Sequence, residues 1–342
     1  MTEPYPYYPA PPVSPAPPML PTFPHAQPQP YHLMLRTWTY EWWKPVVGIV
    51  LAMTGMLVVA PVALLPVLAA GVALQSGPFW QNFLDAATLK AVTPAALFYL
   101  NLVLASMIPL TWFIMRVLHR MRPRWLASVV PRMRWRFFFV CLGLAVIALL
   151  AQILAGTVVP SSSGDGDLAG KLNDFTAGTA AVALVVLLTT PLQAAGEEYL
   201  FRGYLLQAIG SLFRNRWVAI VATATLFAVA HGAQNIPLFF DRFAFGLIAG
   251  WLVTRTGGLE AGIALHILNN FLAFGLALSF GDLTKTLTVS QVSWWNIVLT
   301  LTQSVVYTAL VLLVARKMGL QTTTRPPVDQ PRQAYSEGAV TA

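Results

Sequence analysis

Residues 177–209 read AGTAAVALVVLLTTPLQAAGEEYLFRGYLLQAI, an apolar run that contains a small group of charged side chains. A helix that crosses the hydrocarbon core of a bilayer needs about 20 apolar residues. This run is therefore long enough to span a membrane, and it is too long for one straight crossing. Because Pro191 and Gly196 lie within it, we expect either a bend or an extension into the membrane interface.

The rest of the chain repeats this pattern. Of its 342 residues, 56% are hydrophobic and only 10% are charged, whereas soluble domains carry about 25% charged residues. The sequence therefore predicts an all-α fold, a polytopic transmembrane helical bundle of about eight spans. The expected spans are 46–74, 94–117, 136–159, 177–209, 217–233, 237–254, 259–280 and 295–315.

The two ends of the chain lack apolar runs. Residues 1–30 contain 12 of the 26 prolines, a composition typical of a flexible segment that leans toward polyproline conformation. We expect residues 1–35 and 321–342 to be disordered tails that flank a bundle over 36–320.

Basic residues predict the orientation, because Lys and Arg concentrate in cytoplasmic loops. The loop between the second and third expected spans contains seven arginines, which are Arg116, Arg120, Arg122, Arg124, Arg132, Arg134 and Arg136. With that loop in the cytoplasm, 16 of the 21 Lys and Arg residues lie inside and both termini are cytoplasmic. We expect a protein of the plasma membrane in which the arginines attract anionic lipid, with the lipid bilayer as a partner and no nucleic acid. The single cysteine, Cys141, excludes an internal disulfide and a cysteine-ligated metal site.

Charged side chains inside spans are candidate functional residues, because each costs about 2.5 to 3.5 kcal/mol in the hydrocarbon. Glu198 and Arg202 are four residues apart, which predicts an ion pair on one helix face. Glu197 lies about 100° around the helix and is expected to face a cavity. Phe227 and His231 have the same spacing of four, so the phenyl ring is expected to wall the pocket of the histidine.

His266 and Asn270 repeat the spacing of four and present two hydrogen-bond donors side by side. At 1.5 Å per residue, Glu197, His231, Asn270 and His266 lie about 22, 21, 18 and 12 Å from the cytoplasmic ends of their spans. Four polar groups from three separate helices can therefore meet in one layer.

This set of groups permits hydrolysis. A desolvated carboxylate takes a proton from water, a histidine shares that proton, and a second histidine with an asparagine amide stabilises an oxyanion. The alternative is a polar network that holds helices together or carries protons or ions. The residues by themselves leave both interpretations open.

Three motifs occur in order on successive apolar segments: Glu-Glu-x-x-x-Arg at 197–202, Phe-x-x-x-His at 227–231 and His-x-x-x-Asn at 266–270. This ordered triple resembles the CPBP family, which comprises type II CAAX prenyl endopeptidases and the bacteriocin-processing or self-immunity proteins also called Abi. The resemblance covers about residues 177–280. It implies an intramembrane endopeptidase of the glutamic-protease kind, whose substrate is a membrane-associated or lipidated protein or peptide.

The resemblance also implies roles for individual residues. Glu197 activates water with help from His231, and His266 with Asn270 forms the oxyanion hole. The implied catalytic set is Glu197, Glu198, Arg202, His231, His266 and Asn270, with Phe227 in the pocket. No cofactor is implied; zinc held by Glu197, His231 and His266 is the less favoured alternative.

A second function stays open beside the endopeptidase, namely a non-catalytic membrane scaffold, immunity protein or sensor that binds a peptide in the same pocket. The string Gly164-Asp165-Gly166-Asp167 matches part of the aspartyl intramembrane protease motif, but it lies in a serine-rich loop, and we interpret it as a polar turn. Asp241 and Arg242 are adjacent and point to different faces, so interhelix stabilisation is favoured over lining the cavity.

Overall fold

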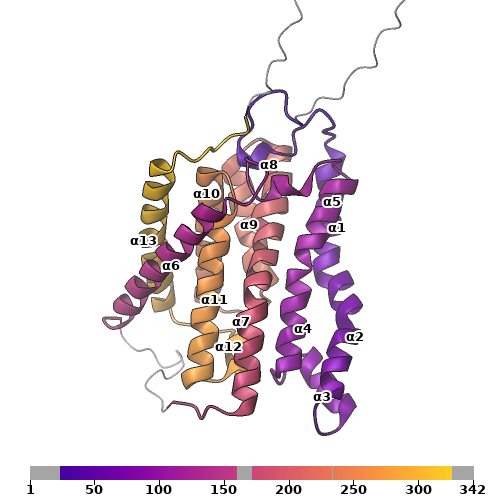
Figure 1. Cartoon of the computed structure of the whole chain (residues 1–342), viewed down its shortest axis with the longest axis vertical. Coiled ribbons are helices and arrows are strands. Elements are labelled where there is room, and N and C mark those ends of the chain that lie inside the picture. The colour runs from indigo at the N-terminus through magenta and orange to yellow at the C-terminus, as the bar shows by residue number, and fades with distance from the viewer. Residues whose placement is uncertain (1–23, 160–171, 233, 326–342) are drawn as a thin grey trace, which may run out of the picture.

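The computed structural model describes residues 24–159, 172–232 and 234–325, and these residues form a helical bundle without a β-strand (Figure 1). The predicted all-α fold is therefore confirmed. In chain order the elements are η1 (Tyr31–Leu33), α1 (Trp43–Thr54), η2 (Gly55–Val59), α2 (Ala60–Ala73), α3 (Phe79–Ala87), α4 (Pro94–Ala105), α5 (Met107–Val117), η3 (Pro123–Leu126), α6 (Trp135–Gly156), α7 (Ala177–Glu198), η4 (Tyr199–Leu205), α8 (Leu206–Phe213), α9 (Arg216–Ala230), α10 (Ile236–Thr256), α11 (Glu260–Phe280), α12 (Leu283–Leu287) and α13 (Trp295–Lys317).

Within the described residues, seven continuous helices are long and apolar enough to cross a membrane. They are Trp43–Ala73, Pro94–Val117, Trp135–Gly156, Ala177–Phe213, Ile236–Thr256, Glu260–Phe280 and Trp295–Lys317. These correspond to seven of the eight expected spans. The remaining one, expected over 217–233, is α9, which has only 15 residues. At about 22 Å, α9 is shorter than the hydrocarbon core of about 30 Å.

The short α9 does not alter which side of the membrane the later loops lie on. It runs antiparallel to α10, since Gly246 packs against Ala224 and Gly250 against Ile220. The start of α9 and the end of α10 therefore lie at the same end of the bundle. Helix α9 stops within the bundle at His231, and Gly232 follows with a φ of +80° that favours glycine.

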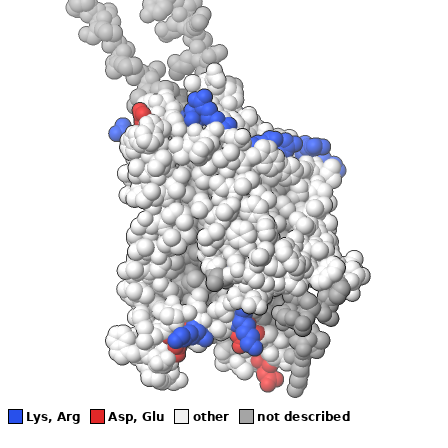
Figure 2. Space-filling view, turned by 180° about the vertical axis from the view of Figure 1, so that it is seen from behind, with Lys and Arg blue, Asp and Glu red and all other residues white. Residues whose placement is uncertain are grey.

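The outer surface of the bundle is apolar. Leu57, Leu150, Leu187 and Val305 are each at least 60% exposed, which is unfavourable in water and favourable among lipid chains. Charged side chains gather at the two ends of the molecule and leave a band between them without Lys, Arg, Asp or Glu on the visible face (Figure 2). This distribution is the one expected for a bundle built in a bilayer.

The apolar run of residues 177–209 lies in one helix of 37 residues, Ala177–Phe213, which is about 55 Å long. It continues through Pro191 and widens into the π-helical segment η4, which carries Arg202. Such π segments insert extra residues into a helix and often occur at functional sites. The expected extension beyond the hydrocarbon core is therefore present, and the irregularity lies after Gly196.

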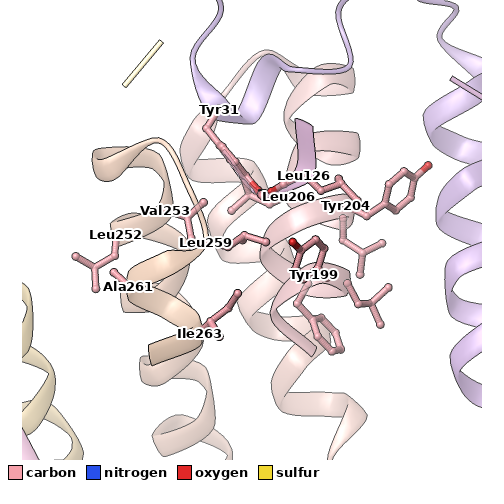
Figure 3. Packing of buried hydrophobic residues seen from close by; sticks show 14 of the residues in the cluster. Tyr31, Leu126, Tyr199, Tyr204, Leu206, Leu252, Val253, Leu259, Ala261 and Ile263 are labelled. Carbon is pink, nitrogen blue, oxygen red and sulfur yellow. Dashed lines mark hydrogen bonds between the residues drawn. The ribbon is translucent and has the colours of Figure 1, made fainter. Parts of the chain in front are cut away.

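Residues 24–35 form a cap over the end of the bundle at which α8 stops. The Tyr31 hydroxyl donates to the carbonyl oxygen of Leu126, and Tyr31 packs in one buried cluster with Leu126, Leu206 and Leu259 (Figure 3). Residues 24–35 were expected to belong to a disordered tail, but Tyr31, Met34 and Leu35 in this segment are buried. Burial of this apolar surface offsets the entropy of ordering the segment.

The first and last described segments meet in this cap. Pro30 and Thr323 form an isolated antiparallel bridge, and the Thr324 amide donates to the Gln29 carbonyl oxygen at 2.9 Å. The first and last described residues therefore lie at the same end of the bundle as the arginine-rich loop. That this end is cytoplasmic stays a prediction, and the remainder of both tails lies outside the described residues.

Two histidines at this end of the bundle, His32 and His119, are uncharged at neutral pH. Burial, with a contribution from the charge of Lys44, lowers the pKa of His119 to about 4, and its ring bonds the Tyr204 hydroxyl at 3.0 Å. Burial also lowers the pKa of His32 to about 4, with a contribution from Arg216. Apolar packing, these neutral groups and the bond from Arg36 Nε to the Ser211 carbonyl oxygen at 2.7 Å hold this end of the bundle together.

Candidate active site

The end of α7 and the start of η4 place two glutamates and an arginine in the interior of the bundle. Arg202 Nη1 lies 2.8 Å from Glu198 Oε1, and both side chains are fully buried. The predicted ion pair is therefore confirmed. The Arg202 guanidinium also lies over the rings of Phe227 and Phe245, at 4.1 and 5.4 Å from their centroids. These cation–π contacts add to the stabilisation that the ion pair gives this buried charge.

His266 of α11 bridges the two glutamates. Its Nε2 lies 3.1 Å from Glu197 Oε2, and its Nδ1 lies 3.0 Å from Glu198 Oε1. With both carboxylates ionised, the ring must carry both protons to donate to each of them. The imidazolium and Arg202 then balance the two negative charges. The predicted meeting of α7 and α11 in one polar layer is confirmed for these residues.

A glycine allows the close approach of α11 to α7. A Cβ on Gly262 would lie 2.7 Å from Glu198 Oε2, inside the contact distance of the two atoms. Gly262 is one helical turn before His266, so the carboxylate reaches the histidine through the space that a side chain would fill.

Asn270 contacts a residue that the sequence analysis did not single out. Its Nδ2 donates to Gln193 Oε1 at 2.8 Å, and Gln193 is 6% exposed. Gln193 lies four residues before Glu197 on α7, so it shares a helix face with the glutamate. That spacing was the available signal in the sequence, but uncharged amides are common in membrane helices and do not by themselves indicate a site.

His231 lies at the end of α9, where its Nδ1 is 2.7 Å from the Phe227 carbonyl oxygen. Because a carbonyl oxygen only accepts, Nδ1 carries the proton and Nε2 of the neutral ring is a free acceptor. The Phe227 ring meets the histidine edge-on at 4.6 Å, which confirms that it walls this residue. His231 interacts electrostatically with Glu197 without a direct hydrogen bond.

The predicted set thus falls into two contact groups. Glu197, Glu198, Arg202 and His266 are joined by direct bonds, whereas His231 and Asn270 flank them without bonding Glu197. Glu197 is 8% exposed, and only its Oε2 has a hydrogen-bond partner among the described residues. Its other carboxylate oxygen is available to a water molecule.

Asp241 and Arg242 point in different directions, as expected. Asp241 interacts with Thr300 of α13, which agrees with a role between helices. Arg242 Nη1 donates to Gln234 Oε1 at 2.8 Å, and the guanidinium interacts electrostatically with Glu197. Arg242 also interacts electrostatically with Asp241. The favoured role between helices therefore stays a prediction for Arg242.

Within the described segments, no three His, Cys, Asp or Glu side chains are arranged so that they could hold a metal ion. The glutamates and His266 instead bond one another. Absence of a cofactor stays a prediction, which activity after treatment with a chelator checks. The Gly164–Asp167 string lies outside the described residues.

The three motifs lie in a segment that matches a known protein family. Residues 179–272 match the family model described as type II CAAX prenyl endopeptidase Rce1-like. These residues form an Rce1-like domain. The domain contains all three motifs and supports the predicted resemblance, and with the seven apolar helices it makes the chain an integral, multi-pass membrane protein.

Two curated proteins are similar to this chain. One is the uncharacterised protein YyaK of Bacillus subtilis (strain 168), 25% identical over 225 residues, which are 61% of this chain and 72% of the relative. The other is an uncharacterised 24.3 kDa protein of Escherichia coli, 35% identical over 92 residues, which are 25% of this chain and 41% of that relative. No solved structure matches the chain.

Proposed function

We propose that the protein is an intramembrane endopeptidase that hydrolyses a peptide bond of a membrane-associated or lipidated protein or peptide. The observation that carries the proposal is the contact of 3.1 Å between Glu197 Oε2 and His266 Nε2 inside the bundle. This contact supports a mechanism in which a general base and an oxyanion donor act on one carbonyl. The Rce1-like domain supports the same class of reaction.

In the proposed reaction, a water molecule bound at the free oxygen of Glu197 attacks the carbonyl carbon of the scissile bond. Glu197 takes one proton of that water as the carbon–oxygen bond forms, and the carbonyl oxygen becomes an oxyanion. His231 Nε2, the free acceptor, orients the water. No covalent bond to the enzyme is required.

Protonation of Glu197 links the two halves of the site. A neutral carboxyl holds the His266 Nε2–H less strongly than a carboxylate does, so this N–H can turn to the oxyanion. The Asn270 amide, oriented by Gln193, supplies a second donor. Collapse of the intermediate breaks the carbon–nitrogen bond, and the proton held by Glu197 passes to the departing amine.

The variant Glu197→Gln tests this proposal. An amide cannot take a proton from water, so we expect hydrolysis to fall by at least about 100-fold while the protein still inserts in the membrane. Membrane proteomics of cells that express wild-type protein, Glu197→Gln or the control Glu41→Gln should show peptide ends that depend on Glu197. Glu41 is exposed near the cap, so its loss removes a carboxylate without touching the site.

If cells that express Glu197→Gln at the wild-type protein level keep the wild-type phenotype, the proposal of a hydrolytic function is wrong. A peptide-binding scaffold or sensor that uses the same pocket is then the better description. The location in the plasma membrane belongs to the proposal as well, and fractionation of cells checks it.

A further inference from the structure

Arg242 is a cation inside a membrane span that forms no ion pair with any carboxylate of the described residues. It lies on the second turn of α10 and is half-buried. Among the described residues its guanidinium donates to a neutral group, Gln234 Oε1, at 2.8 Å. Asp241, the nearest acid in sequence, interacts with Thr300 on α13 and electrostatically with Arg242, but it forms no ion pair with the arginine. An arginine in this setting is costly unless an anion compensates it.

The position of Arg242 is tied to the candidate site. Gln234 accepts from the guanidinium and donates through its own amide to the Ala228 carbonyl oxygen at 2.6 Å. Gln234 thus links Arg242 to the end of α9, at which His231 lies. Arg242 also interacts electrostatically with Glu197 and His231.

The charges of the site balance without Arg242. Glu197 and Glu198 are offset by Arg202 and by His266, which bonds both carboxylates. Arg242 adds a further positive charge, with which Asp241 interacts electrostatically without an ion pair. The guanidinium has five N–H donors, one of which donates to Gln234. None of its nitrogens is fully buried without a hydrogen-bond partner. Among the described residues the remaining donors form no hydrogen bond, and their nitrogens keep some exposure.

We propose that Arg242 binds a carboxylate of the peptide substrate beside the scissile bond, an inference that rests on the proposed function. A planar guanidinium with several free donors matches the two oxygens of a carboxylate. In the low-dielectric interior this pairing compensates the unpaired cation. The carboxylate belongs either to a free peptide C-terminus or to an acidic side chain, and the experiment below separates these sources.

The experiment measures binding without turnover. Glu197→Gln protein in lipid nanodiscs is mixed with three pools of random apolar nonapeptides, and retained peptides are quantified by mass spectrometry. The first pool has a free C-terminal carboxylate, the second a C-terminal amide, and the third a C-terminal amide with one internal Asp. We expect a charged pool to be retained at least about tenfold more than the amidated apolar pool. Whichever charged pool is retained identifies the source of the carboxylate.

Variants of Arg242 assign the preference to this residue. In the Glu197→Gln background, Arg242→Gln should remove the preference for carboxylate, and Arg242→Lys should retain it in part because the charge persists without the planar fork. Arg255→Gln is the matched control, since Arg255 is exposed at the other end of α10. Gln234→Ala separates bracing of the turn from ligand binding, and it should keep the preference.

Equal retention of all three pools, retention of none, or a preference that survives Arg242→Gln would overturn the proposal. Failure of the proposed function has a different signature. In that case wild-type protein hydrolyses no peptide in any pool, while the Arg242-dependent preference for carboxylate in the binding measurement remains.

Discussion

At the scale of single residues, the space at Gly262 determines how closely Glu198 approaches His266. In Gly262→Ala the new methyl group would lie 2.7 Å from Glu198 Oε2, the far end of a flexible side chain. The carboxylate must move, and its bonds to His266 and Arg202 are disturbed, although the backbone can stay in place. Because a displacement of about 1 Å in a catalytic group costs about 100-fold in rate, we expect a loss of that order in the rate of hydrolysis, measured with membranes that contain equal amounts of protein.

The matched control for this variant is Gly275→Ala on the same helix, where a Cβ would meet no atom within 4 Å. It should leave the rate unchanged. Melting temperatures of both variants should stay close to that of the wild type. A normal rate with Gly262→Ala would mean that the contact between Glu198 and His266 is not needed for the reaction.

At the scale of helices, the position of the site depends on the packing of α7 against α4. A Cβ on Gly196 would meet the backbone of α4, at 2.8 Å from the Leu104 carbonyl carbon and 3.0 Å from Ala105 Cα. Backbone atoms cannot turn away as a side chain does, so Gly196→Ala must push the two helices apart. We expect it to destabilise the protein by about 1 to 3 kcal/mol, seen as a lower melting temperature in detergent.

Gly143→Ala on α6 is the control for Gly196→Ala, since a Cβ at Gly143 meets no atom within 4 Å. Both substitutions replace a glycine by alanine in a membrane helix, so they share the gain in helix propensity. A melting temperature for Gly196→Ala equal to that of Gly143→Ala would show that α4 and α7 do not pack as closely as described.

At the scale of the whole molecule, the two ends of the bundle should lie on opposite sides of the membrane, with the arginine-rich end in the cytoplasm. Arg122 and Lys90 are exposed and lie in segments at opposite ends of the span Pro94–Val117. With Cys141 replaced by Ala, a membrane-impermeant maleimide applied to intact cells should label Lys90→Cys and not Arg122→Cys. After the cells are opened, both variants should be labelled. The reverse pattern would show that the orientation is inverted.

Much of the fold and part of the site follow from local sequence. The apolar runs predicted the spans, because a bilayer requires each crossing segment to satisfy its own backbone hydrogen bonds. The spacing of four predicted the pair of Glu198 with Arg202 and the contact of Phe227 with His231, both of which occur. These features depend only on the geometry of one helix. The order of the three motifs predicted a family resemblance, and the match of residues 179–272 to the family model supports it.

Tertiary structure decided what depends on contacts between separate segments. The bridge of His266 to both glutamates and the bond of Asn270 to Gln193 depend on the relative rotation and depth of α7 and α11. The periodicity of each helix does not contain this information. The order of residues 24–35 likewise comes from a binding surface made by distant parts of the chain. Sequence by itself determined which segments enter the bilayer and which groups are costly there. The reason is that each residue makes its own contribution to the free energy of transfer from water into lipid. Only the packed bundle decided which of those groups meet, because helix faces are matched by side-chain shape across the whole structure.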